Sequence, residues 1–137
     1  MNTTTKRTVA SIAAGALIAA PATVLLAGPA SADGPEREAR GTVAGAQYDI
    51  SVEKDGRFEV SADLDGVPSG STWKVVVKHE GKKVGSQTRN AKRDDGRYEV
   101  DFRDFHSENT RGKDTFKVTI KRVDGAGKVT RTLTFKR

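Results

Sequence analysis

Few residues in this chain could take part in catalysis or bind a metal ion. The 137-residue sequence has two histidines, His79 and His106, and no cysteine. It has no Gly-x-Ser-x-Gly motif to present a serine nucleophile and no His-x-x-x-His pair to bind a metal. Two Asp-rich stretches, 63–66 and 94–96, resemble parts of calcium loops but lack the later ligands, and Asp-Gly pairs are typical of turns. We therefore expect no enzyme activity, metal or cofactor.

Basic residues and threonines recur at alternate positions in the second half of the chain. Side chains two residues apart on a strand share one face, so this pattern could form a surface that attracts anions. The candidate anion-binding residues are Lys74, Lys78, Lys83, Arg89, Lys117, Lys121 and Lys136. Lysine and threonine are also common on exposed strands that bind nothing, so a solvated surface remains the alternative.

The positions between these residues are apolar, and a period of two runs through most of the chain. Such alternation is typical of half-buried strands in antiparallel sheets. It covers seven segments, 48–52, 58–64, 73–77, 84–89, 98–102, 116–120 and 129–135. The pattern predicts an all-β domain over residues 46–137, a seven-stranded antiparallel sandwich.

Turn residues suggest how three pairs of these strands align. The expected loops are a three-residue loop at 54–56, a Glu80-Gly81 loop and a four-residue loop at 124–127. The expected cross-strand pairs are Val52 with Phe58, Val77 with Val84, Lys78 with Lys83, and Phe116 with Phe135. Arg131 would then face inward, and we expect it near the rim with its charged end in water.

Trp73 in the third segment and the long loop before Asp114 carry a resemblance to an immunoglobulin-like or fibronectin-type sandwich. Phe116 and Val118 stand where immunoglobulin domains have a corner tyrosine and a cysteine, so the resemblance is to the architecture only. It implies one sheet from segments one, two and five and another from segments three, four, six and seven. We expect Trp73 in the core.

This division predicts outer faces of opposite charge. Outward positions of the first sheet are mostly acidic, and those of the second include no acid. The expected acidic residues are Asp49, Glu53, Glu59, Asp63, Glu99 and Asp101, accompanied by Arg57, Arg97 and Arg103.

The first 32 residues have the features of a secretory signal peptide. Lys6 and Arg7 precede an alanine-rich apolar stretch, and Ala30 and Ala32 form a small-x-small site before Asp33. We expect a helical signal peptide at 1–32, a flexible arm at 33–45, and secretion without a stable membrane anchor. In composition the chain resembles proteins of high-GC Gram-positive bacteria. The formal net charge is +6, of which the leader contributes two.

These features predict a secreted, non-catalytic binding module whose basic surface binds anionic polymers, such as cell-wall polymers or lipid head groups. The first alternative is a protein-interaction module or inhibitor that contacts a secreted or surface protein through loop 104–113, near Phe105 and His106. That loop could instead be a solvated connection whose Phe105 fills the end of the core. The second alternative is a structural domain without a specific ligand. Nucleic acid is disfavoured, because the surface lacks aromatic residues that stack on bases.

Overall fold

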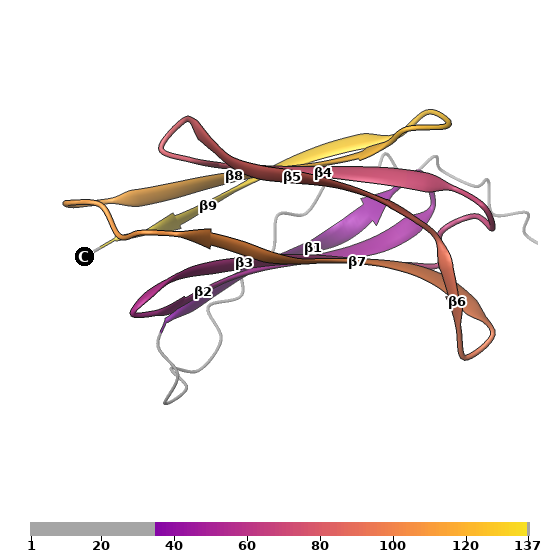
Figure 1. Ribbon diagram of the computed structural model, residues 1–137, viewed down its shortest axis with the longest axis horizontal. Coiled ribbons are helices and arrows are strands. Elements are labelled where there is room, and N and C mark those ends of the chain that lie inside the picture. The colour runs from indigo at the N-terminus through magenta and orange to yellow at the C-terminus, as the bar shows by residue number, and fades with distance from the viewer. Residues whose placement is uncertain (1–34, 137) are drawn as a thin grey trace, which may run out of the picture.

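The computed structural model describes residues 35–136, which form two packed antiparallel sheets (Figure 1). The strands are β1 (Glu36–Val43), β2 (Ala46–Asp55), β3 (Arg57–Asp65), β4 (Thr72–His79), β5 (Lys82–Asn90), β6 (Lys92–Asp94), β7 (Arg97–Ser107), β8 (Asp114–Arg122) and β9 (Lys128–Phe135). One sheet has the order β1-β2-β3-β7-β6 and the other β5-β4-β8-β9. All-β sandwich architecture and the expected division of the seven segments between two sheets are thereby confirmed.

The core lies between the sheets and consists of the apolar residues that alternate along each strand. Trp73, Phe58, Phe102 and Phe116 are its largest fully buried side chains. Trp73 is therefore a core residue, as expected, and its indole nitrogen donates a hydrogen bond of 2.8 Å to the Ser71 hydroxyl. This bond satisfies the one polar atom of the indole, which would be costly to bury alone.

The expectation of a flexible arm at 33–45 is wrong for its described part. Residues 36–43 form β1, which pairs with β2 from Glu36↔Glu53 to Val43↔Ala46. Ala39 and Val43 are buried, but they are small and stand among charged residues, so the alternation is weak in the sequence. Pairing with β2 supplies the backbone hydrogen bonds that hold this segment in a strand.

Two further differences concern the chain between β5 and β8. The three-residue strand β6 was not expected. β7 is longer than predicted and runs to Ser107, with a bulge opposite Val60 and Ala62. Phe105 therefore belongs to a strand and is buried in the core.

Three of the four expected cross-strand pairs are wrong by one or two residues, and the assignment of faces holds except on β5 after position 84. Val52 pairs with Val60 rather than Phe58, and Phe116 pairs with Leu133 rather than Phe135. Both shifts are of two residues, so each side chain keeps its face. The Glu80-Gly81 turn and the Lys78↔Lys83 pair are confirmed, but a bulge at position 84 places Gly85 opposite Val77.

Arg131 faces inward as expected, is half-buried, and lies against Tyr48. Its Nε lies 2.5 Å from the Tyr48 hydroxyl, and its guanidinium lies 5.5 Å from the centre of the Tyr48 ring. The two residues come from different sheets, so this contact joins β9 to β2 at one end of the core.

Candidate functional site

Six lysines gather on the outer face of the sheet formed by β5, β4, β8 and β9. They stand in two rows that run across the strands, because each lysine is the direct register partner of the next. One row is Lys83, Lys78 and Lys117, and the other is Lys74, Lys121 and Lys128. All six side chains are exposed. We call this surface the lysine face.

Neutral residues separate the two rows. Ser86, Val76, Thr119 and Thr130 lie between them, one from each strand. The rows are four residues apart along a strand, or about 13 Å, and neighbouring strands are about 4.8 Å apart. Among the described residues, no acidic side chain occupies an outward position on these four strands.

The nearest acidic residues of this sheet are occupied elsewhere. Glu80 accepts a hydrogen bond from the backbone N–H of Thr115, and Asp124 accepts one from that of Thr72. Both carboxylates lie in turns at the ends of strands, so the lysine rows lack a neutralising partner within their own surface.

Five of the seven candidate anion-binding residues lie on the lysine face, and two do not. Lys136 follows the end of β9 and is exposed. Arg89 pairs with the buried Trp73 and therefore belongs to the side of the sheet that faces β7. The bulge at position 84 is the cause, because one extra residue reverses the alternation of every later residue on β5.

Lys128 belongs to the lysine face but was missed by the sequence analysis. The register expected for the last hairpin placed it beside the loop, whereas it pairs with Lys121. An alternation count extended from Thr134 back through Thr130 would have found it.

The outer face of the other sheet carries two rows of three carboxylates, with Glu38 between the rows and with Asp65 and Glu99 beyond the row of aspartates. One row is Asp49, Asp63 and Asp101, and the other is Glu36, Glu53 and Glu59, again as direct register partners. We call this surface the acidic face. Arg40 contacts Asp49 at 2.7 Å, and Arg103 contacts Asp63 at 2.9 Å, so some of its charge is neutralised.

Two carboxyl groups of this face, Asp63 and Glu99, have raised pKa values. The negative charge of Asp101 raises the pKa of Glu99. Burial raises the pKa of Asp63, and Asp101 adds to this effect while Arg103 opposes it. Like charges thus disfavour the ionised form of Glu99, whereas burial is the main cause at Asp63.

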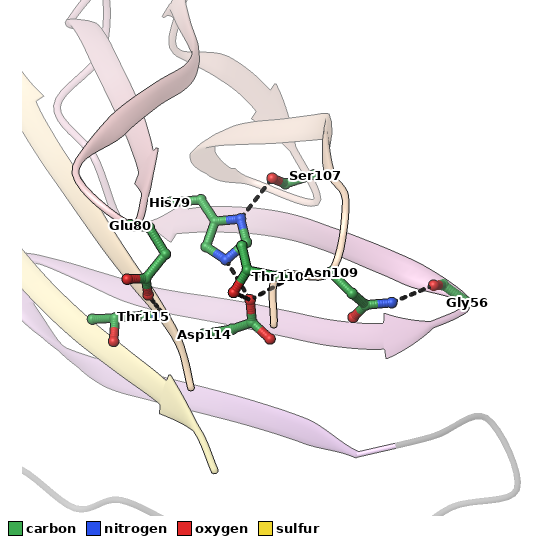
Figure 2. A network of polar contacts seen from close by, with 8 residues as sticks. All are labelled: Gly56, His79, Glu80, Ser107, Asn109, Thr110, Asp114 and Thr115. Atoms are coloured by element: carbon green, nitrogen blue, oxygen red, sulfur yellow. Dashed lines mark hydrogen bonds and ion pairs between the residues drawn. The ribbon is translucent and has the colours of Figure 1, made fainter. Parts of the chain in front are cut away.

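A second polar cluster closes one end of the sandwich (Figure 2). The two ring nitrogens of His79 contact Ser107 and Asp114, with distances of 2.7 Å from Nδ1 to the Ser107 hydroxyl and 2.9 Å from Nε2 to Asp114 Oδ1. The same carboxylate oxygen accepts hydrogen bonds from the N–H and the hydroxyl of Thr110, at 3.0 and 2.6 Å. The cluster joins β4, β7 and β8 and the loop that precedes β8.

Ser107, His79 and Asp114 are the residue types of a hydrolytic triad, and an open hollow of about 460 Å³ adjoins His79 and Ser107. In serine proteases the nucleophile contacts Nε2 and the aspartate contacts Nδ1, which is the reverse of the arrangement here. The His79 ring is also stacked on Phe116, with centroids 4.1 Å apart, and its side chain is 5% exposed. These contacts are those of a structural anchor.

The loop expected to contact a partner is shorter than predicted. Phe105 is buried, and His106 is half-buried and paired with Glu59, so both belong to β7. Residues 108–113 remain as the loop, and its start is held by the Asn109 amide, which donates a 2.7 Å hydrogen bond to the Gly56 carbonyl (Figure 2).

Residues 35–136 contain no helix that could span a membrane and no cluster of side chains suited to hold a metal ion. The predicted cleavage residues Ala30, Ala32 and Asp33 lie outside the described residues. No protein family, curated protein or solved structure matches the chain. Its function must therefore be argued from the two charged faces.

Proposed function

We propose that this protein is a secreted, non-catalytic binding module whose lysine face binds anionic polymers, such as cell-wall polymers or the head groups of a membrane surface. The observation that carries the proposal is the pair of three-lysine rows on one sheet without an intervening acid. Directly opposed like charges destabilise a sheet slightly, by a few tenths of a kcal/mol per pair. A polyanion bound along a row would neutralise the opposed charges and so remove this destabilisation.

The expected affinity is moderate and sensitive to salt. A lysine close to an anionic surface contributes roughly 1 kcal/mol, so six would contribute about 6 kcal/mol. That energy corresponds to a Kd on the order of tens of micromolar. The hydroxyls of Thr119, Thr130 and Thr132 add hydrogen-bond donors beside the lysines.

The strand order supports an immunoglobulin-like or fibronectin-type assignment for the sandwich. In one sheet the neighbours β2, β3 and β7 correspond to strands A, B and E of an immunoglobulin domain. In the other sheet the neighbours β4, β8 and β9 correspond to its strands C, F and G. Secretion rests on the features of residues 1–32. On these grounds we propose that the lysine face belongs to a domain outside the cell.

The test compares two triple variants with the same loss of charge. The row variant removes one lysine row by the substitutions Lys74→Gln, Lys121→Gln and Lys128→Gln. The control variant removes three lysines outside the face by the substitutions Lys82→Gln, Lys92→Gln and Lys113→Gln. Binding to immobilised heparin and to purified wall teichoic acid is measured over a range of salt concentrations. The row variant should bind at least tenfold more weakly, and the control less than threefold.

Equal losses of affinity for the two variants would show that only net charge matters and would contradict the proposal. Unchanged binding by the row variant at low salt would also contradict it. The alternative of a partner-binding loop receives less support, because Phe105 is buried and residues 108–113 carry no exposed apolar side chain.

A further inference from the structure

We propose that this protein associates with further copies of itself, with the lysine face of one copy stacked on the acidic face of the next. This proposal goes beyond polymer binding, because its partner is a second copy of the chain and because it requires the acidic face as well.

The charged rows of the two faces have the same spacing and opposite sign. Each face has two rows of three like charges on three neighbouring strands, and in each the rows are four residues apart, as from Lys74 to Lys78 and from Asp49 to Glu53. Val76 and Thr119 lie between the lysine rows, and Ser51 and Ser61 lie between the carboxylate rows, where β1 adds a further acid, Glu38, as the partner of Ser51. The spacings match because both come from the same sheet geometry, about 4.8 Å between strands and about 3.3 Å per residue.

Within one copy these charges cannot neutralise each other. The faces are the opposite outer surfaces of a two-layer sandwich, as Figure 1 shows for β4, β5, β8 and β9 against β1, β2, β3 and β7. Arg40, Arg97 and Arg103 each pair with a carboxylate of the first sheet, but no acid lies within the lysine rows of the described chain. The partner that fits each face is therefore the other face of a second copy.

The contact would be heterologous, since two different surfaces meet. Each copy in a pair keeps one free face, and the pair as a whole keeps one face of each kind, so growth gives open chains rather than closed dimers. Four strands over five residues cover about 300 Å² per partner, well below the roughly 800 Å² of a stable complex. The association is accordingly weak, reversible and suppressed by salt.

The first measurement is sedimentation velocity of the purified protein over a range of concentrations, at ionic strengths of about 10 mM and 500 mM. At low ionic strength the weight-average mass should rise at least twofold and continue past the dimer. At high ionic strength the protein should be monomeric. A monomer under both conditions, a closed dimer, or association unaffected by salt would each overturn the proposal.

Charge-reversal variants test the geometry. Lys78→Glu with Lys117→Glu alters one direct pair on the lysine face, and Glu53→Lys with Glu59→Lys alters one direct pair on the acidic face. Each variant alone should stay monomeric. An equimolar mixture should form chains in which the two variants alternate, because the unaltered faces fit each other and the two altered faces, with both charges reversed, also fit each other. A chain with all four substitutions should regain concentration-dependent growth. Failure of the mixture to pair would overturn the proposal.

Two controls keep the outcome clear. Circular dichroism checks that each variant is folded. Where a charge reversal unfolds the protein, the same two positions are changed to Gln instead. These neutral variants should reduce association at least threefold. The acidic-face variant should still bind heparin, since its lysine face is intact. Loss of self-association with retained heparin binding would support this proposal and the proposed function, whereas retained self-association with retained heparin binding would reject self-association alone.

Discussion

Asp114 and His79 are buried neighbours from different strands, with Asp114 Oδ1 2.9 Å from His79 Nε2. Because a carboxylate only accepts hydrogen bonds, the ring donates through Nε2. The same oxygen accepts the N–H and the hydroxyl of Thr110. One carboxylate therefore holds both the histidine at the end of β4 and the loop before β8.

Replacing Asp114 should destabilise the fold strongly. Asp114→Ala removes the acceptor of the buried His79 ring and of the half-buried Thr110, at a cost of about 3 kcal/mol. The control is Thr115→Ala, at a half-buried position of the same strand, where we expect the free energy of unfolding to change by less than about 0.5 kcal/mol. Urea unfolding followed by tryptophan fluorescence measures both. Similar midpoints for the two variants would contradict the anchor role of the cluster.

The same carboxylate predicts how stability depends on pH. Burial acts to raise the pKa of Asp114, but the hydrogen bonds from Thr110 and His79 outweigh it and hold this pKa below its ordinary value of 3.8. The stabilisation is thus complete above pH 4 and is lost as pH falls through the lower folded pKa. The gap in urea midpoint between the native protein and Asp114→Asn should be wide at pH 6 and narrow near pH 2. A constant gap would show that the charge of Asp114 contributes nothing.

Gly41→Ala should disturb the contact between Tyr48 and Arg131. A Cβ at Gly41 would lie 2.6 Å from the Tyr48 hydroxyl oxygen, so the ring would have to move. We expect a loss of about 1–3 kcal/mol, as for other overpacked sites. Thr42→Ala, at the exposed neighbouring position, is the control. Tyr48→Phe removes the clashing oxygen, so the double variant should lose less than the sum of the two single losses.

Ala39→Asp tests whether residues 36–43 form a strand. Ala39 is 6% exposed and pairs with the core residue Ile50, so a carboxylate there would be buried without a partner. We expect a loss of about 3 kcal/mol. Thr42→Asp on the exposed side of β1 should cost less than about 0.5 kcal/mol. Thermal unfolding compares them, and a silent Ala39→Asp would favour the flexible arm.

Asp101→Asn should relieve the crowding on the acidic face. Because the charge of Asp101 is the main cause that raises the pKa of Glu99, the substitution should lower that pKa. In the native protein the raised pKa means that ionised Glu99 opposes folding, so its penalty diminishes as pH falls through the folded pKa. NMR titration of the Glu99 side-chain carboxyl carbon measures the shift. Glu36→Gln, on the other carboxylate row, should leave it nearly unchanged.

Local pattern predicted the strands well because the period of two is a property of neighbouring residues. Trp73, Phe116 and Val118 read as core residues from alternation alone, and they are buried. The register errors at Val52 and Phe116 did not disturb the faces, since a shift of two residues preserves them. The anchor could also have been found, because His79 and Asp114 stand in phase with buried neighbours and a buried charge needs a partner.

The sequence by itself determined the strands and their buried faces, because each depends on alternation within one strand, and the resemblance in architecture then supplied the two sheets and the opposite charge of their outer faces. Only the tertiary structure decided which lysines share a surface. Phe105 of β7 packs against Gly85, where a Cβ would lie 3.0 Å from its ring, and the adjacent bulge turns Arg89 away from the lysine face. Likewise, β1 becomes a strand through pairing with β2. These contacts join residues far apart in the chain, so their energies are absent from any local pattern.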